Sequence, residues 1–245
     1  MSTNGQDLDG ARAAEDALVA ASIPALEEAC ARAGFRVAVD ADMFALRRYL
    51  QACGAYDNPS FDPNEHDLSR DAFWLRAEDA SGRIVASHAE RVYDCRDFVQ
   101  EIVETDRVWF DKGVPLETST WRTAVSHPPV TISGKVAFAG GMFVQPDQRG
   151  SGLALYLPYL SRSLCLRDHG TQWHTGLVRE NIARTRVATE YYGFPRTTHL
   201  FFGTIPRTTG DFKDLHLCWM DRAEAVQRLR ELPSHARYPV AVPGA

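Results

Sequence analysis

The stretch Gly140–Asp168, GGMFVQPDQRGSGLALYLPYLSRSLCLRD, restricts the fold more than any other part of the chain. With residues 136–139 it begins as an apolar run that ends at Val144, the composition of a strand buried on both faces. Pro146 ends this strand, because proline has no N–H group to donate to a sheet. Apolar side chains then recur at helical spacing, at Leu153, Tyr156, Leu157, Leu160 and Leu164. The pattern predicts a buried strand, a glycine turn and a helix.

The turn between the strand and the helix has the properties of an anion site. The first N–H groups of a helix have no intrahelical acceptor, and the helix dipole places partial positive charge there. Gly150 and Gly152 carry no Cβ atom that would keep an anion from the backbone, and Arg149 adds a positive charge. We expect the turn to bind a phosphate or pyrophosphate. A plain strand-to-helix connection is the alternative that this motif alone leaves open.

Two common phosphate-binding motifs are excluded. A P-loop requires a Gly-Lys-Ser/Thr sequence at the start of the helix, and this turn contains no lysine. A dinucleotide-binding fingerprint requires a third glycine, and Leu155 stands in its place. The turn therefore belongs to another class of anion site, or to none.

A second motif follows about one strand later. Residues Asn181–Phe194, NIARTRVATEYYGF, place an asparagine at the start of a helix and Gly-Phe at its end. Together with Arg149–Ala154, RGSGLA, this motif resembles the paired acyl-CoA-binding motifs of the GNAT N-acetyltransferase superfamily. Arg149, Gly152 and Ala154 fill the three defining places of the first motif. The resemblance implies an α/β (α+β) fold with a mixed, mostly antiparallel central sheet flanked by helices, here with an N-terminal helical extension.

The resemblance also implies a set of residues that bind the donor, acetyl-CoA or another acyl-CoA. In this family the fourth strand is bulged and splays from the fifth, and pantetheine lies in the opening. The implied donor-binding residues are Met142, Phe143, Val144, Arg149, Gly150, Ser151, Gly152, Leu153, Ala154, Leu155 and Asn181. Gly140 and Gly141, inside the strand, indicate either this approach of a ligand or tight packing against a neighbouring element.

The candidates for proton transfer are less well defined. Many family members have a tyrosine as general acid four residues before the glycine of Gly-Phe, and Thr189 stands there in this chain. Tyr191 and Tyr192 are the nearby phenols and are our general-acid candidates. His174 is a candidate general base on the strand after the glycine turn. Glu90, with His88 on the same strand face, is an alternative base or acceptor-binding group. For each, a purely structural role is the competing interpretation.

Composition limits the classes of function. The chain has 245 residues, 44% apolar content and a formal net charge of −5, which fits a soluble globular protein and argues against nucleic-acid binding. No apolar run reaches the length of a membrane span, and the polar, acidic N-terminus is unlike a signal peptide. Five cysteines without close spacing suit a reducing cytoplasm. With neither a Cys-x-x-Cys nor a His-x-x-x-His pattern, we expect no metal site.

The periodicity, together with what the resemblance implies, divides the chain into three parts. Residues 1–33 form an N-terminal helical extension in which Pro24 is expected to break the helix of residues 11–33. Residues 34–232 form the acyltransferase-like domain, with an insertion at 93–134, and residues 233–245 form a tail. Within the domain, helices are predicted over 43–53, 97–110, 181–192 and 222–232, and strands over 35–39, 72–77, 84–92, 171–179, 201–205 and 215–220. Pro158 is expected to kink the helix that follows the glycine turn.

These observations favour a cytoplasmic N-acyltransferase that moves an acyl group, in the first instance acetyl, from CoA to a primary amine in a ternary complex. The acceptor is a small molecule or a peptide, and no nucleic acid or membrane is expected as a partner. A homodimer is considered as the assembly. A GNAT-like sensor or scaffold that binds acyl-CoA without turnover is the first alternative, favoured by Thr189. An aminoacyl-tRNA donor is a second, against which the acidic net charge argues.

Overall fold

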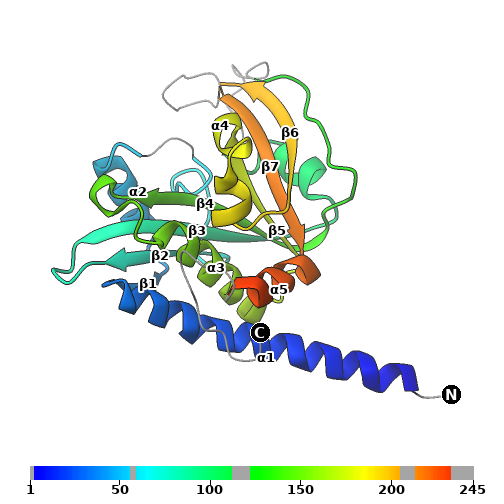
Figure 1. Ribbon diagram of the computed structural model, residues 1–245. Coiled ribbons are helices and arrows are strands. Elements are labelled where there is room, and N and C mark those ends of the chain that lie inside the picture. Colours follow the sequence, from blue (N-terminus) through cyan, green and yellow to red (C-terminus); the bar gives the residue numbers. More distant parts are fainter. Residues whose placement is uncertain (1–2, 56–58, 112–121, 205–212, 233–245) are drawn as a thin grey trace.

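The computed structural model describes residues 3–55, 59–111, 122–204 and 213–232, with only the backbone described over 3–9 (Figure 1). Seven strands form one sheet in the order β1-β2-β3-β4-β5-β7-β6. The strands are β1 Arg36–Asp40, β2 Ala72–Glu78, β3 Ile84–Cys95, β4 Gly134–Val144, β5 Trp173–Arg179, β6 Arg196–Gly203 and β7 Lys213–Asp221. The helices are α1 Thr3–Arg32, α2 Met43–Ala52, α3 Leu153–Leu164, α4 Glu180–Ala183 and α5 Arg222–Glu231.

All neighbouring strand pairs are antiparallel except β4 and β5, which are parallel and joined by α3. The result is the mixed, mostly antiparallel sheet with flanking helices, preceded by an N-terminal helix, that the sequence predicts. The resemblance to the GNAT superfamily therefore holds at the level of the fold. No helix in the described part of the chain is both long and apolar enough to cross a bilayer.

The central strands β4 and β5 separate toward one end. Their parallel pairing runs from Val136 opposite Trp173 to Ala139 opposite Gly176 and stops there, although β4 continues to Val144. On its other edge β4 pairs with β3, and the register of this pairing shifts between Ser87 and Ala89 of β3. The strand that the sequence marks with two glycines is thus bulged and splayed, as the resemblance implies.

Gly140 and Gly141 of β4 serve different needs. A Cβ atom on Gly140 would lie 2.4 Å from Cε2 of Phe61, so this position is closely packed. Gly141 has φ +57°, which side chains other than glycine rarely adopt, and its carbonyl accepts a 2.8 Å hydrogen bond from Ser87 Oγ. Of the two explanations left open by the sequence, tight packing applies to Gly140 and the bulge to Gly141.

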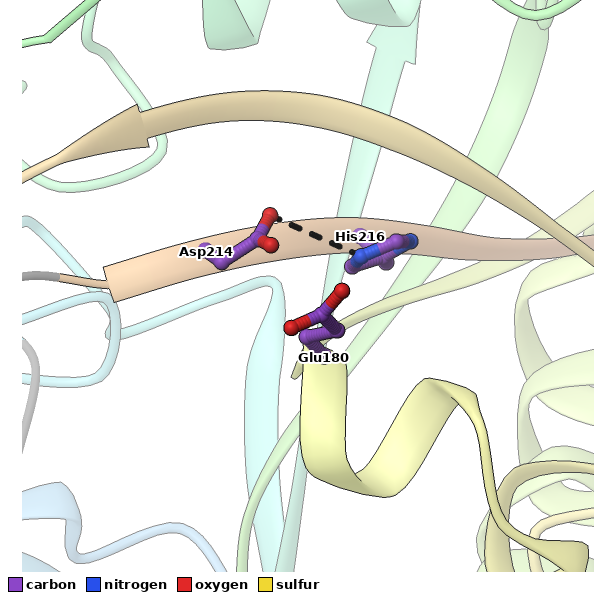
Figure 2. Close-up of side chains that lie close together, drawn as sticks. All are labelled: Glu180, Asp214 and His216. Carbon is purple, nitrogen blue, oxygen red and sulfur yellow. Dashed lines mark ion pairs between the residues drawn. The ribbon is translucent and has the colours of Figure 1, made fainter.

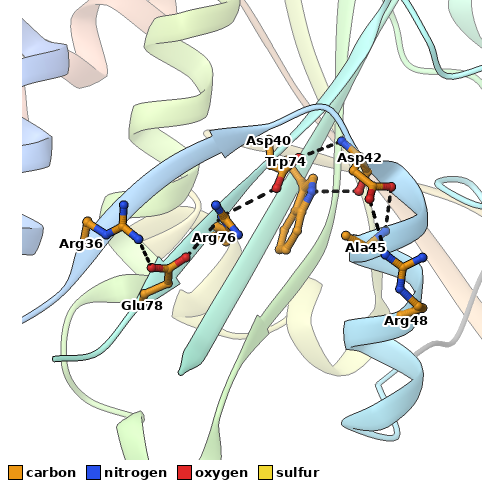
Figure 3. A network of polar contacts seen from close by, with 8 residues as sticks. All are labelled: Arg36, Asp40, Asp42, Ala45, Arg48, Trp74, Arg76 and Glu78. Atoms are coloured by element: carbon orange, nitrogen blue, oxygen red, sulfur yellow. Dashed lines mark hydrogen bonds and ion pairs between the residues drawn. The ribbon is translucent and has the colours of Figure 1, made fainter. Parts of the chain in front are cut away.

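Two apolar layers cover the sheet. One lies between the sheet and helices α1, α3 and α5, and Figure 1 shows α1 running beneath α3 and α5 on this face. The other face is covered by α2 and residues 98–110. A polar network of Arg36, Asp40, Asp42, Arg48, Trp74, Arg76 and Glu78 connects β1, β2 and α2 (Figure 3). In it Asp42 caps α2 by accepting from the N–H of Ala45 at 3.0 Å.

The prediction that Pro24 breaks the first helix is wrong. Helix α1 is continuous from Thr3 to Arg32, with Pro24 inside it. Proline removes one backbone hydrogen bond, but one side of the helix is anchored in the core. Leu26 and Cys30 are fully buried, and Ser22 Oγ lies 2.8 Å from Ser163 Oγ of α3. Tertiary packing thus outweighs the local cost of proline.

The predicted helix over 97–110 is reduced to a π-helical turn at Val99–Val103. Asp106 has φ +63°, a left-handed conformation that a continuous helix does not permit. The prediction of an inward apolar side is nevertheless confirmed, because Phe98, Ile102 and Trp109 are buried.

The predicted helix over 181–192 divides into α4 and a π-helical turn, Val187–Tyr191. Thr185 lies between the two and bonds the carbonyl of Ile182 through its hydroxyl. Pro158 does not interrupt α3, which runs from Leu153 to Leu164 before a further π-helical turn, Cys165–His169.

Part of the predicted insertion lies outside the described residues, namely 112–121. From Arg122 the chain runs along the outer edge of β6, where the N–H groups of Thr123 and Ser126 donate to the carbonyls of Phe202 and Leu200. The edge strand is thereby covered. The domain boundaries drawn from the sequence remain a prediction.

The packing of β4 predicts a difference between two strand glycines. Gly140→Ala should lower the free energy of unfolding by about 1–3 kcal/mol, because its Cβ atom displaces the ring of Phe61. Gly176→Ala is the matched control, since its Cβ atom would meet its nearest neighbour at 3.4 Å. Urea unfolding measures both. Equal stability of the two variants would contradict the packing account, and Phe61→Leu should restore much of the loss in Gly140→Ala.

Candidate functional site

The N-terminus of α3, like that of the short helix α4, lacks the side-chain cap that α2 and α5 have. Asp42 caps α2, and Asp221 caps α5 in a capping box with Glu224. At α3 the cap position is Gly152, with φ +94°, and no side chain bonds the first turn. Leu155 N–H donates to the Gly152 carbonyl at 2.8 Å, but no capping carboxylate neutralises the positive end that α3 presents.

A pocket of about 250 Å³ lies at this end of α3. Its lining is formed by Val144, Gln148, Arg149, Gly150, Ser151, Gly152, Leu153, Ala154, Val187 and Tyr191. The hydroxyl oxygen of Ser151 is buried there and has no hydrogen-bond partner among the described residues. A buried hydroxyl without a partner is costly unless a ligand or water bonds it. An oxygen-rich anion satisfies both the hydroxyl and the uncapped helix end.

The far wall of the pocket is fixed to α3 itself. Arg162 is buried in α3 and donates to the carbonyl of Tyr192 at 2.6 Å, while its guanidinium stacks on the rings of Tyr159 and Phe194. Tyr159 also packs so closely on Gly193 that a Cβ atom there would lie 2.6 Å from the phenol oxygen. These contacts hold the Val187–Tyr191 turn, and hence Tyr191, beside the glycine turn.

The structure brings together most of the predicted donor-binding residues. Residues 149–154 and Val144 line the pocket. Leu153 and Leu155 are fully buried, and Leu155 is not in the pocket lining. Met142 and Phe143 lie on β4 beyond its pairing with β5.

Asn181, like Met142, Phe143 and Leu155, is a predicted donor-binding residue outside the pocket lining. It is exposed on the first turn of α4 and is not in the pocket lining. A contact between Asn181 and a pantetheine arm therefore stays a prediction.

The two tyrosines occupy different environments. Tyr191 lines the pocket together with the glycine turn. Tyr192 is largely enclosed, and burial, followed by the neighbouring Cys218 thiol, raises its pKa. Thr189, where the family has its tyrosine, is exposed and bonds the carbonyl of Arg186. Tyr191 shares the pocket with the phosphate-binding candidates. Its position therefore favours contact with an anion over proton donation to the sulfur at the other end of an acyl-CoA.

The base candidates are enclosed beneath α3. His174 is 2% exposed and lies 3.1 Å from the Thr171 hydroxyl, and burial lowers its pKa well below the usual value. Glu90 is 3% exposed and accepts from Ser161 Oγ at 2.8 Å, with His88 Nε2 at 3.4 Å from the same carboxylate oxygen. Neither His174 nor Glu90 lines the pocket. Their surroundings agree with the structural interpretation that the sequence left open.

The residues present fit the pyrophosphate of an acyl-CoA. The fit rests on the uncapped α3 terminus, the unpartnered Ser151 hydroxyl and the exposed charge of Arg149 at the mouth of the pocket. The edge of β4 that β5 leaves unpaired fits the amide-bearing arm of the same molecule.

Sequence reasoning missed the residues that position the pocket rather than line it. Arg162 is the clearest case, because an arginine on a helix is expected at the surface. Nothing in the local pattern pointed to it, because at 100° per residue Arg162 lies on the opposite side of the helix from Leu160 and Leu164. Its partner, the carbonyl of Tyr192, could not be identified without the fold.

Comparisons with known proteins were made by family model, sequence and structure. No family model matches the chain, and no curated protein matches its sequence. In structure, the chain is similar to a spermidine N-acetyltransferase from Vibrio cholerae in complex with CoA and spermine, with 14% identity over 78% of this chain and 98% of that chain and a TM-score of 0.45. It is also similar to Arabidopsis thaliana NAA60 in complex with acetyl-CoA, with 13% identity over 76% and 99% of the two chains and a TM-score of 0.47. A CoA-dependent acyl-homoserine lactone synthase, BjaI, has 17% identity over 82% and 81% and a TM-score of 0.42. Similarities of this size say nothing of the reaction.

The anion pocket predicts the effect of a charge at Gly150. Gly150→Glu should weaken the binding of CoA at least tenfold, about 1.4 kcal/mol, because the carboxylate repels the pyrophosphate at the uncapped helix end. Gly34→Glu is the matched control: Gly150 and Gly34 have φ of +87° and +90°, and neither has an atom within 4 Å of an added Cβ. Isothermal titration with CoA measures both variants. The pocket is misassigned if Gly150→Glu and Gly34→Glu bind CoA equally well.

The buried imidazole of His174 predicts a dependence of stability on pH. Its pKa is lowered in the folded state, so below about pH 6.5 the unfolded chain takes up a proton that the folded chain does not. Stability is therefore lost as pH falls from 6.5 toward the folded pKa, by up to about 1.4 kcal/mol per pH unit for this group.

Denaturant unfolding between pH 7.5 and pH 5 measures this loss. His174→Gln should flatten the dependence by one proton, while His127→Gln, on an exposed histidine, should leave it unchanged. Parallel curves for the wild type and His174→Gln would show that His174 takes up its proton equally in both states.

Proposed function

We propose that this chain is an acyl-CoA-dependent N-acyltransferase that transfers an acyl group, in the first instance acetyl, to a primary amine in a ternary complex. The observation that carries the proposal is the uncapped N-terminus of α3, which meets the splayed edge of β4 in one pocket. Val144, the last residue of β4, lines this pocket together with the glycine turn. An extended molecule with an anionic group at one end and amides along its length fits both features.

The residues of the chain have separable roles in this proposal. Backbone N–H groups at the start of α3 and the Ser151 hydroxyl bind the pyrophosphate, and Arg149 screens its charge. Backbone groups of Met142 to Val144 orient the pantetheine arm along β4. Acetyl-CoA would supply a thioester that is already activated toward amines, so holding donor and acceptor together contributes much of the rate.

A proton must still leave the amine and reach the sulfur. The enclosed positions of His174, Glu90 and Tyr192 argue against a direct part for them in this transfer, and Tyr191 is the candidate phenol that lines the pocket. We assign Tyr191 to the anion end of the pocket because it shares the lining with Gly150 and Gly152. The acceptor is a small-molecule or peptide amine, and thiol release over a panel of amines identifies it.

The test of the proposed function is release of free thiol from acetyl-CoA in the presence of a panel of amines, with the acetylated product identified by mass. The panel spans polyamines, amino acids and peptide N-termini. Thiol release that depends on one amine class establishes the transferase. Tight binding of acetyl-CoA with no release on any amine would instead support the non-catalytic binding module.

The placement of the two tyrosines predicts different kinetic effects. Tyr191→Phe should raise the dissociation constant of acetyl-CoA several-fold with little change in kcat, because its phenol lies at the anion end. Tyr192→Phe is the comparison, and as a largely enclosed phenol it should change neither constant much. A large fall in kcat for Tyr191→Phe with unchanged binding would make Tyr191 the general acid and contradict the assignment.

A further inference from the structure

The two edges of the sheet differ in how they are covered. At one edge, residues 122–126 run along β6 and hydrogen-bond to it. The polar side chains of the neighbouring strand also face the chain itself: Figure 2 shows Asp214 and His216 of β7 turned toward Glu180 of α4. At the other edge, no segment of the described chain pairs with the outer side of β1. An edge strand left open in this way pairs readily with a strand of another molecule.

Strand β1 also lacks the features that usually protect an edge strand, which are proline, bulges and charges along the strand. Its sequence Arg36–Asp40, RVAVD, has no proline and carries charges only at its two ends, and it pairs with β2 without a register shift. Val39 is 57% exposed, and Phe44, at the start of α2, is 49% exposed. They are two of the four large apolar side chains that are exposed in the described part of the chain. Apolar exposure beside an open edge indicates an interaction surface.

The sequence of β1 is complementary to itself. When two copies of RVAVD pair antiparallel about Ala38, Arg36 of each copy stands opposite Asp40 of the other, and Val37 stands opposite Val39. A shift of one residue in either direction breaks both charge pairs, so the charges specify this register. A two-fold axis at Ala38 closes the arrangement, because every contact then occurs twice and no open edge is left to add a third copy.

The charged ends of β1 lie on one face of the strand and are able to take a second partner. The side chain of Arg36 is 71% exposed, although it pairs with Glu78 (Figure 3). Asp40 accepts the N–H of Asp42 at 2.8 Å, and its other oxygen lies 3.7 Å from Nε of Arg76. An ionised carboxylate has about four acceptor positions, so Asp40 keeps the capacity to bind a further guanidinium.

We propose that two copies of this chain associate through β1, which pairs antiparallel with its counterpart about Ala38 and joins the two seven-stranded sheets into one. Each exposed Val39 then gains an apolar neighbour across the strands. Five residues per copy make a small interface, for which we expect a dissociation constant of about 1–100 µM. The proposal is independent of the acyltransferase proposal, because no residue of β1 lines the pocket at α3.

The test is analytical ultracentrifugation of the wild-type chain from about 1 to 500 µM, a range that spans the expected dissociation constant. The wild type should change from monomer to dimer across this range. Val39→Lys should weaken dimerisation at least 30-fold, because it places a charge on the open edge, opposite Val37 of the other copy. Val130→Lys is the matched control, since it makes the same substitution at a valine that is 40% exposed and outside the strands, and it should dimerise as the wild type does. A wild type that stays monomeric throughout, or a Val39→Lys variant that dimerises equally well, overturns the proposal.

An exchange of charges tests the register. Arg36→Glu places a carboxylate opposite Asp40 of the other copy, and Asp40→Lys places an ammonium opposite Arg36, so each variant alone should lose the dimer. An equal mixture of the two variants should form a heterodimer, because both facing pairs then have opposite charges. Circular dichroism checks that each variant is folded. Folded variants that form no heterodimer would show that β1 does not pair about Ala38.

Hydrogen exchange of the wild type tests the same contact without a substitution. The outward-facing amides of β1 should exchange more slowly at a concentration above the dissociation constant than below it, because the partner strand accepts their hydrogen bonds. Exchange in residues 127–133, outside the proposed interface, should not depend on concentration. Exchange in β1 that is the same at both concentrations, while the chain dimerises, would place the interface elsewhere and contradict the proposal.

Discussion

The positive end of α3 is the constraint on which the candidate site depends. The free N–H groups at a helix end without a capping side chain bond water or a ligand. The N-terminus of α3 has no such cap, and with Gly152 at φ +94° it lines a pocket. The same chain caps α2 and α5 with aspartates, so it has no general lack of capping residues. An aspartate at residue 152 would neutralise the charge that an anion needs.

Much of the remaining structure keeps α3 in this position. All residues of α3 except Ala154 are buried, between the sheet on one side and α1 on the other. Arg162 and Tyr159 extend from it to hold the turn that carries Tyr191. The buried guanidinium is a costly element, because two of its nitrogens have no partner among the described residues. In return, the guanidinium of Arg162 positions the turn that forms one wall of the pocket.

The sequence predicts the parts of the fold that have a strong local signal. The apolar run to Val144, the glycine turn and the helical spacing after it are local patterns, and all three are found in place. The predictions failed where packing overrides local preference. Pro24 stays inside α1 because the helix is anchored in the core, and the helix expected over 97–110 ends early because Asp106 turns left-handed.

The site also divides into residues that a local pattern identifies and residues whose surroundings depend on packing. The pocket lining is nearly contiguous in sequence, so the motif at 149–154 identified most of it. The enclosure of His174 and Glu90 depends on which face of the sheet α3 covers, and residue type alone does not give that information.

The most direct measurement of the central claim compares acetyl-CoA with acetyl-pantetheine in calorimetric titrations of the wild-type chain. The two ligands share the thioester and the amide-bearing arm, and acetyl-CoA adds 3′-phosphoadenosine and the pyrophosphate. If the uncapped end of α3 binds that group, acetyl-CoA should bind at least about 100-fold more tightly, a difference of about 2.7 kcal/mol. Equal affinities, or no binding of either ligand, would contradict the account and leave the glycine turn a plain connection.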